Sequence, residues 1–274
     1  MQQCREILLH QLRGAVHELA VREPNIHGAR KQLKRARATL RLLRPAIGDD
    51  SYRRENIAAR DAARPLSKAR DEEVLSQAHA GLVERFGQAA DGGLHLHHGA
   101  RELPAAQLDR IKTALERSMT RAREWQLEDA DWNCIEKGLR STYRRGRHAL
   151  RRSRKDRATE DLHEWRKQTK YLWHQLQVVT PLAHGPIGEL ADEFHQLADY
   201  LGDEHDLAVL RERASGKLPE LIDRRREELQ DKAFALGERL YADKAKTFVH
   251  DLRKQWTAWE RKGAPRHPTA ISAQ

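Results

Sequence analysis

The sequence predicts an all-α protein built from two helical bundles. Apolar residues recur at helical spacing along most of the chain, alternation of β-branched residues is nearly absent, and glycine and proline fall between the periodic segments. With 274 residues, the chain can form one large domain or two smaller ones with cores of their own. We expect helices at residues 3–20, 25–44, 50–63, 66–88, 104–127, 131–153, 159–179, 187–214, 219–240 and 243–261.

Prolines and capping residues support the order of these helices. Three prolines lie where the first turn of a helix tolerates them, namely Pro24, Pro104 and Pro219. Three residues are suited to cap a helix N-terminus, namely Asp49, Asp131 and Thr159. Pro65 should break or kink its helix, because proline lacks a backbone donor and clashes with the preceding turn. Residues 91–104 (DGGLHLHHGARELP) predict a loop.

One motif, H-x-x-R-K-x-x-K, occurs twice in the chain. It begins at His27 and again at His163, an offset of 136 residues, and all four of its defined positions match. A second pair of segments, ARDEEVL and EHDLAVL, repeats at an offset of 135 residues, from Asp71 to Asp206. Two elements repeated in order at nearly one spacing indicate an internal duplication, which suits two bundles related by a pseudo-two-fold axis. The chain then divides into a first repeat, a second repeat and a disordered tail, at residues 1–128, 129–262 and 263–274.

The repeated motif places positive charge on one face of each predicted helix. Lysine and arginine total 51 against 41 acidic residues, so the formal net charge is +10 and the pI is near 9.8. At about 100° per residue, the cations of the first helix occupy an arc of roughly 120° opposite an apolar stripe, and the second helix repeats this division. Arg37 and Arg41 extend the first arc, and His174 extends the second. Because like charges at helical spacing cost stability, the repeated stripe favours a bound polyanion over a solvated face.

These motifs resemble the conserved histidine α-helical domain, or CHAD, family. The resemblance rests on the two H-x-x-R-K-x-x-K segments, on R-D at 70–71, on L-G-x-x-H-D at 201–206 and on YRRGR at 143–147. It covers nearly the whole chain, about residues 5–260. It implies two four-helix bundles with internal symmetry and a basic central groove or pore. It also implies binding of inorganic polyphosphate, with some members of the family found on polyphosphate granules.

The resemblance carries a set of ligand contacts onto this chain. By motif position these are His27, Arg30, Lys31, Lys34, Arg37, His163, Arg166, Lys167 and Lys170. Arg70 and His205 are further candidates, each beside an aspartate that either orients it or is an ordinary surface residue, Asp71 or Asp206. From the residues alone we add Arg41, Arg144, Arg147 and His174. Arg144 and Arg147 belong to a basic segment, 139–155, that either extends the groove or faces water.

The chemistry of these residue types suits polyphosphate independently of the resemblance. Arginine offers forked donors to phosphate oxygens, lysine offers a point charge, and protonated histidine donates two N–H bonds. An anion favours the protonated imidazole, so we expect affinity to rise as the pH falls through the histidine range.

Two other classes of function compete with this one. Nonspecific nucleic-acid binding is the alternative, because the same stripes attract any phosphate backbone, although Trp165 and Trp173 suit the core better than base stacking. We expect no enzyme activity and no cofactor, because no paired carboxylates or nucleophile stand near the stripes. Three histidines in the 91–104 loop, His95, His97 and His98, offer a weak metal site without an obvious fourth ligand.

The remaining composition predicts a cytoplasmic protein, with association with polyphosphate granules as a further expectation. Cys4 and Cys134 do not form a C-x-x-C motif and are expected to be free thiols in a reducing compartment. No apolar run reaches the roughly 18 residues that a membrane-spanning helix needs, so we expect no membrane partner.

Overall fold

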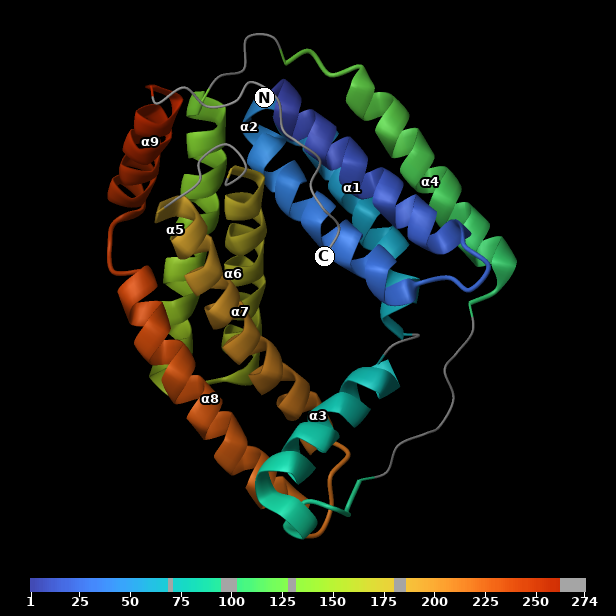
Figure 1. Cartoon of the computed structure of the whole chain (residues 1–274), viewed down its shortest axis with the longest axis vertical. Coiled ribbons are helices and arrows are strands. Elements are labelled where there is room, and N and C mark those ends of the chain that lie inside the picture. The colour runs from blue at the N-terminus through green and yellow to red at the C-terminus, as the bar shows by residue number, and fades with distance from the viewer. Residues whose placement is uncertain (69–70, 95–102, 128–131, 180–185, 262–274) are drawn as a thin grey trace.

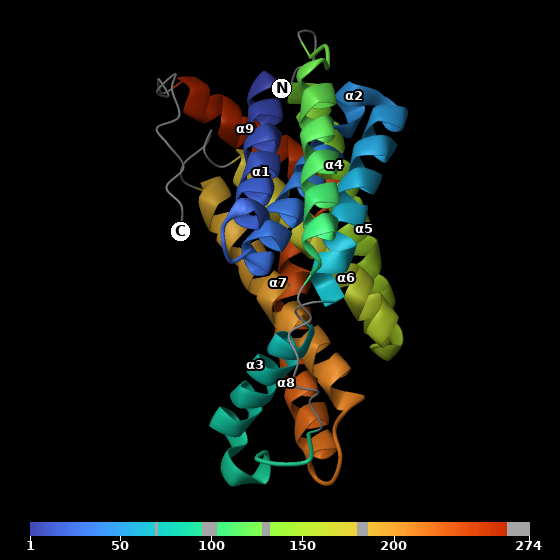
Figure 2. The same cartoon turned by 90° about the vertical axis from the view of Figure 1, so that its right-hand side faces the viewer.

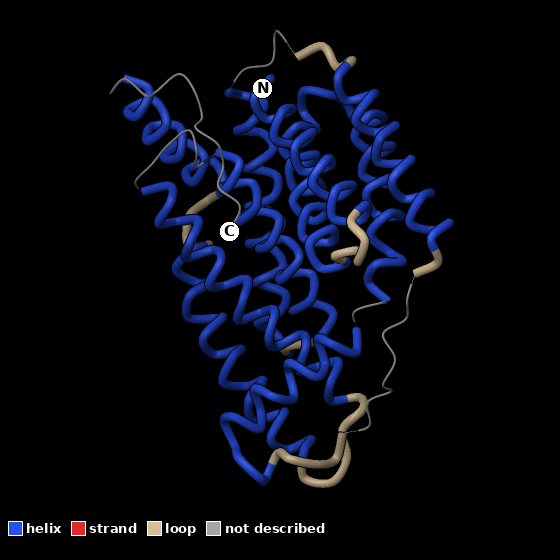
Figure 3. The backbone as a smooth tube through the Cα atoms, turned by 45° about the vertical axis from the view of Figure 1, so that its right-hand side comes forward, coloured by secondary structure: helices blue, strands red, loops and turns tan. Residues whose placement is uncertain are grey.

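The chain folds into helices joined by short loops over the residues that the computed structural model describes, which are 1–68, 71–94, 103–127, 132–179 and 186–261. Figure 3 shows no strand in these ranges, and the predicted all-α class is confirmed. The helices are α1 (Gln2–Ala20), α2 (Ile26–Lys68), α3 (Asp71–Phe86), the short 3-10 helix η1 (Gly87–Ala89), α4 (Ala105–Arg123), α5 (Trp132–Asp156), α6 (Thr159–Val179), α7 (Pro186–Arg211), α8 (Leu218–Leu240) and α9 (Ala245–Arg261).

Two positions in α2 show how the chain turns within the first half. Gly48 has φ 79° and ψ 166°, and this conformation, which favours glycine, divides α2 into two helical segments. The division agrees with the gap predicted between residues 44 and 50. Pro65, in contrast, lies inside α2, and the boundary predicted there falls between Lys68 and Asp71 instead. Proline removes a single backbone bond, and the fully buried Leu66 holds the next turn in the core.

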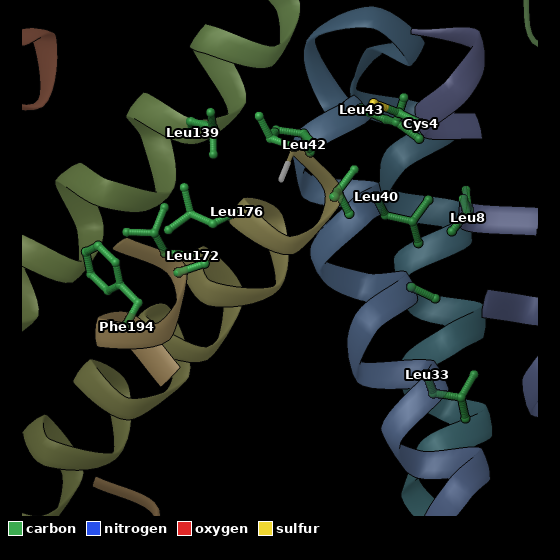
Figure 4. Packing of buried hydrophobic residues seen from close by; sticks show 14 of the residues in the cluster. Cys4, Leu8, Leu33, Leu40, Leu42, Leu43, Leu139, Leu172, Leu176 and Phe194 are labelled. Atoms are coloured by element: carbon green, nitrogen blue, oxygen red, sulfur yellow. The ribbon is translucent and has the colours of Figure 1, made fainter. Parts of the chain in front are cut away.

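One hydrophobic core includes residues from both predicted halves of the chain. It extends from Leu8 in α1 to Leu252 in α9. Figure 4 shows Leu42 of α2 facing Leu139 of α5. At Gly138 a Cβ atom would lie only 2.7 Å from the carbonyl oxygen of Leu42, so the backbones of α2 and α5 approach as closely as glycine allows.

Helix α3 packs against α7 and α8, which belong to the second half of the sequence. Leu75 and Leu82 of α3 share a separate apolar cluster with Leu207, Leu210 and Ile222. Figures 1 and 2 show α3 beside the ends of α7 and α8, beyond the bundle that contains α1, α2 and α4. The first half therefore contributes a helix to the packing of the second half, and residues of α2, α3, α6, α7 and α8 come together around one cavity.

Candidate polyanion-binding site

A basic cavity of about 690 Å³ lies where α2, α3, α6, α7 and α8 meet. Both copies of the H-x-x-R-K-x-x-K motif reach it, although they are far apart in the sequence. The polar and charged residues that line it are His27, Arg30, Lys34, Gln77, His163, Arg166, Lys170, Asp203, His205, Asp206 and Arg225. The first, fourth and eighth positions of each motif thus face the same space.

Helix α2 contributes His27, Arg30 and Lys34 to the cavity. Their spacing of three and four residues places them on one face, while the apolar stripe on the other face is buried in the core. Arg30 also donates to the carbonyl oxygens of Leu66, at 3.5 Å, and Ser67, at 3.3 Å. These carbonyls belong to the last turn of α2, which lacks helical partners, so Arg30 ties the two ends of α2 together at the cavity wall.

Helix α6 contributes His163, Arg166 and Lys170 in the same spacing. Gly202 of α7 faces two of them, and a Cβ atom there would lie 3.5 Å from Nζ of Lys170 and 3.9 Å from Nε of Arg166. Burial, together with the charges of Arg166 and Lys34, lowers the pKa of Lys170 to about 7. Burial also lowers the pKa of Arg166. The fold therefore holds two cations of α6 in an environment that disfavours their charge.

Two aspartates of α7, Asp203 and Asp206, share the cavity with the cations. Asp206 partly counteracts the lowering of the pKa at both Arg166 and Lys170. Burial raises the pKa of Asp203, and the nearby carboxylates of Asp199 and Asp206 raise it further. Five lysine and arginine side chains and two aspartates line the cavity, which gives a formal net charge of +3 when the histidines are neutral. The carboxylates reduce the positive charge without cancelling it.

The imidazoles of His163 and His205 lie close together, with ring centroids 4.7 Å apart. Burial lowers the pKa of His205 to about 4, and the neighbouring charges of Arg166 and Lys170 contribute. Burial and the charge of Arg166 also lower the pKa of His163. The cavity thus keeps both rings neutral near pH 7, and a bound anion would oppose this effect.

Two polar atoms in the wall have no hydrogen-bond partner among the described residues, namely Nε of Arg166 and Nδ1 of His205. A buried polar atom left without a partner costs about 1–3 kcal/mol. The helix behind them is firmly held, because the buried carboxylate of Glu204 accepts hydrogen bonds from Arg226, at 2.8 and 3.0 Å, and from Gln230, at 3.0 Å. The unpartnered atoms of Arg166 and His205 could therefore bind a ligand, and the hydrogen bonds of Glu204 hold α7 in place beside them.

The fifth position of each motif points elsewhere. Lys31 is exposed and Lys167 pairs with Glu164, and neither belongs to the described lining of the cavity. Both lie at the edge of the predicted arc, about 40° beyond the histidine. Direct contact of these two lysines with a ligand stays a prediction, and a ligand held in the cavity would not require it.

Arg37 and Arg41 lie farther along α2, past the cavity. Arg37 donates to Oδ1 of Asn56 at 3.2 Å, and Arg41 donates to the same atom at 3.2 Å. The Arg41 guanidinium also lies 3.8 Å from the ring centroid of Tyr171. These contacts join the two segments of α2 to each other and to α6.

The other predicted contacts fall in three different environments. His174 is only 6% exposed, its Nδ1 lies 3.0 Å from Oε1 of Gln177, and burial lowers its pKa to about 3, so it does not suit a cationic contact near pH 7. Arg144 and Arg147 line a separate hollow on α5. Arg70 lies outside the described residues, as does the side chain of Asp71.

Sequence reasoning missed Arg225, Gln77 and Asp203. Arg225 belongs to a run of three arginines at 224–226 in α8, which was the available signal. A basic run on a helix with acidic neighbours resembles an ordinary charged surface, and only the packing of α8 against α7 brings it to the cavity. Gln77 comes from α3, whose position on α7 no local pattern indicates.

The described residues show neither a metal-binding cluster nor a membrane-spanning helix. The described residues contain no group of three or more histidine, cysteine or acidic side chains that could hold a metal ion. His95, His97 and His98 lie outside those residues. Within the described part of the chain, no helix combines the length and the apolar character that crossing a membrane requires.

Comparison with known protein families identifies a match over most of the chain. The family model of the CHAD domain matches residues 3–215, which include both histidine helices and the L-G-x-x-H-D segment of α7. Comparison with curated proteins and with solved structures gave no match. Since the family model spans most of the sequence, including both motif copies that face the cavity, the chain belongs to the CHAD family.

Proposed function

We propose that this chain binds inorganic polyphosphate in the cavity between α2 and α6. The observation that carries the proposal is that His27, Arg30 and Lys34 line the same cavity as the matching residues of the second motif. Membership of the CHAD family is consistent with polyphosphate binding at the level of the family. A pseudo-two-fold relation between the two histidine helices, with the cavity as the basic groove, belongs to the same proposal.

The chemistry of the lining supports a chain of phosphates as the ligand. Arg166 can donate from its unpartnered Nε and from the rest of its planar fork to phosphate oxygens. Lys34 and Lys170 supply point charges, and His163 and His205 gain a second donor when they are protonated. A phosphate chain would therefore relieve both the repulsion among the cations and the unsatisfied polar atoms.

A matched pair of double variants tests the site. Lys34→Gln with Lys170→Gln removes two charges from the cavity, whereas Lys31→Gln with Lys167→Gln removes two charges from the same helices outside it. We expect the first pair to weaken binding of long-chain polyphosphate by roughly 100-fold, because each charge-assisted contact contributes about 1.5 kcal/mol. For this variant, the decrease of log affinity with log salt should be less steep than in the wild type, by roughly 1.5 in slope. Isothermal titration calorimetry at two salt concentrations measures both quantities.

The second pair of variants is the control. Lys31→Gln with Lys167→Gln changes the net charge equally, so it should reproduce only the general electrostatic part of the effect, a loss of a fewfold. Equal losses in the two double variants would show that the cavity is not the site.

Nonspecific nucleic-acid binding is the competing function. The only rings in the described lining of the cavity are imidazoles, and Trp165 is fully buried in the core, which disfavours a stacking platform for bases. Polyphosphate should therefore displace a single-stranded RNA at a much lower phosphate concentration than RNA displaces polyphosphate. A fluorescence anisotropy competition in both directions measures this, and equal potency would favour the alternative.

The protein is proposed to bind polyphosphate without hydrolysing it. In the cell, this binding should bring the protein to polyphosphate granules. Purified protein mixed with long-chain polyphosphate should release no phosphate, with or without Mg²⁺, in a colorimetric assay, and sustained release would contradict this part of the proposal. In cells that contain polyphosphate granules, a fluorescent fusion should collect on the granules, and the Lys34→Gln/Lys170→Gln variant should remain diffuse.

A further inference from the structure

A second strongly basic hollow, of about 360 Å³, lies on α5 at the start of α9. Among the described residues it has no side chain in common with the cavity between α2 and α6. Its described lining consists of four arginines and a histidine of α5 together with Lys244, Ala245 and Lys246. No carboxylate belongs to that lining, in contrast to the cavity, where two aspartates face the cations.

The arginines of the hollow lie along one exposed face of α5. Arg140, Arg144, Arg147 and Arg151 recur at intervals of four, three and four residues, so they form a single row along one face. The opposite face of α5 is buried in the core, which fixes the direction in which the row points. Adjacent like charges in such a row cost stability, and the described residues show no ion pair that would offset this cost at Arg140, Arg144 or Arg151.

The start of α9 completes the hollow. Helix α9 begins at Ala245, and its first turn contains no acidic residue. The free backbone N–H groups of a first turn carry partial positive charge, which favours phosphate. Arg147 donates to the carbonyl oxygens of Tyr241, at 2.9 Å, and Ala242, at 3.2 Å. Arg147 therefore anchors the turn before α9 and holds it against α5.

Acidic residues separate this hollow from the cavity. Glu160, Asp161 and Glu164 at the start of α6 line a further depression, which borders the hollow at Arg144 and His148. Arg152 pairs with Asp161 at 2.5 Å, and Glu164 pairs with Lys167. Because carboxylates interrupt the positive surface there, the α5 row is not a continuation of the cavity.

From these observations we infer that α5 and the N-terminus of α9 form a second polyphosphate site, distinct from the cavity. This inference takes its class of ligand, polyphosphate, from the proposed function. It does not require that the cavity itself binds that ligand. The described lining contains cations and one alanine and offers no aromatic ring beyond the imidazole of His148, so it recognises phosphates and not bases. A chain that carries one negative charge per phosphate can contact successive arginines of the row with different phosphates.

The test counts tripolyphosphate ions bound per protein chain by calorimetry. The α5 variant is Arg140→Gln with Arg144→Gln and Arg151→Gln, which leaves the anchor Arg147 in place. The matched control removes three exposed arginines that line neither site, in the variant Arg13→Gln/Arg110→Gln/Arg123→Gln. Far-UV circular dichroism confirms that each variant keeps its helicity.

We expect the wild type and the control to bind two tripolyphosphate ions and the α5 variant to bind one. The Lys34→Gln/Lys170→Gln variant should also bind one, and the combination of both sets should bind none. An α5 variant that still binds two ions overturns the inference while leaving the cavity in place. If only the α5 variant loses an ion and the cavity variant loses none, the cavity proposal fails and the second site stands.

A competition experiment with RNA tests whether the α5 site prefers polyphosphate or nucleic acid. In the Lys34→Gln/Lys170→Gln variant, which isolates the α5 site, tripolyphosphate should compete with a single-stranded RNA more strongly than RNA competes with tripolyphosphate at equal phosphate concentration. The reverse order would overturn the assignment of polyphosphate to this site.

Discussion

The positive charge of Lys170 should strengthen polyphosphate binding and, at the same time, destabilise the folded protein in the absence of ligand. Its ammonium group lies in the cavity beside Arg166 and Lys34, where burial and these charges lower its pKa to about 7. The substitution Lys170→Met shortens the unbranched side chain by one atom and removes the charge. We expect the variant to bind polyphosphate more weakly and to unfold less readily than the wild type.

The size of the effect follows from the pKa. Each pKa unit corresponds to about 1.4 kcal/mol, so lowering the pKa from the ordinary 10.5 to about 7 means that holding the ammonium costs about 5 kcal/mol below pH 7. Methionine does not recover all of this, because it loses the attraction of Asp206, and replacement of buried charge typically gains roughly 1–4 kcal/mol. The folded pKa is lowered, so the unfolded chain binds more protons between about pH 7 and 10.5. The wild type therefore regains stability as the pH rises through that window.

Urea unfolding without ligand, followed by circular dichroism, measures the difference between the two proteins at about pH 6 and about pH 10. We expect Lys170→Met to be more stable by roughly 1–4 kcal/mol at the lower pH and within about 1 kcal/mol at the higher pH. The matched control is Lys167→Met, one turn away on α6, which removes a partly exposed lysine paired with Glu164 and should change stability by less than about 0.5 kcal/mol. A difference for Lys170→Met that does not vary with pH, or that has the opposite sign at low pH, would refute the assignment of a strained ammonium.

Three further predictions concern proton uptake on ligand binding, the role of Asp206 in the cavity, and the close packing of α2 against α5 at Gly138. Polyphosphate binding at about pH 7.5 should take up protons, because an anion raises the pKa of Lys170, and calorimetry in two buffers of different ionisation enthalpy should show an uptake that Lys170→Met reduces. Asp206→Asn should tighten polyphosphate binding by roughly fivefold, about 1 kcal/mol, since it removes a like charge from the ligand site, and a weaker affinity in the same titration would indicate that Asp206 orients the cations. Gly138→Ala should cost roughly 1–3 kcal/mol in urea unfolding, because its Cβ would lie 2.7 Å from the carbonyl oxygen of Leu42, and an unchanged midpoint would contradict the tight packing of α2 on α5.

Helical periodicity was enough to predict the fold class and most helix positions. The helix at 159–179 agrees with α6 to the residue, because its apolar stripe, its first-turn acids and the glycine and proline that follow it all point the same way. The position of α3 could not be predicted. Its pattern resembles that of any amphipathic helix, and the partner of its apolar face, the end of α7, lies more than 100 residues along the chain.

The residues predicted as contacts line the cavity where they occupy the first, fourth and eighth positions of the repeated motif and not where only the charge count supported them. Positions 27, 30 and 34, with their counterparts in α6, line the cavity as the helical arc indicates. Arg37 and Arg41 share that arc but lie later along α2, and a helical wheel discards distance along the axis. His174 shares the arc of α6, but the packing of α6 buries it outside the described lining of the cavity. Angular position alone therefore does not show which residues along a helix reach a cavity.

The cavity places its cations where they are least stable in the absence of a partner, and this links stability to affinity. Lys170 and Arg166 have lowered pKa values, Nε of Arg166 lacks a partner among the described residues, and two neutral histidines lie within the same positive field. A surface row such as that on α5 loses little when it is empty, because water solvates it. Residues that destabilise the empty protein gain the most when a polyanion arrives, since binding restores their charge and satisfies their donors. Affinity in the cavity should therefore depend steeply on pH near 7.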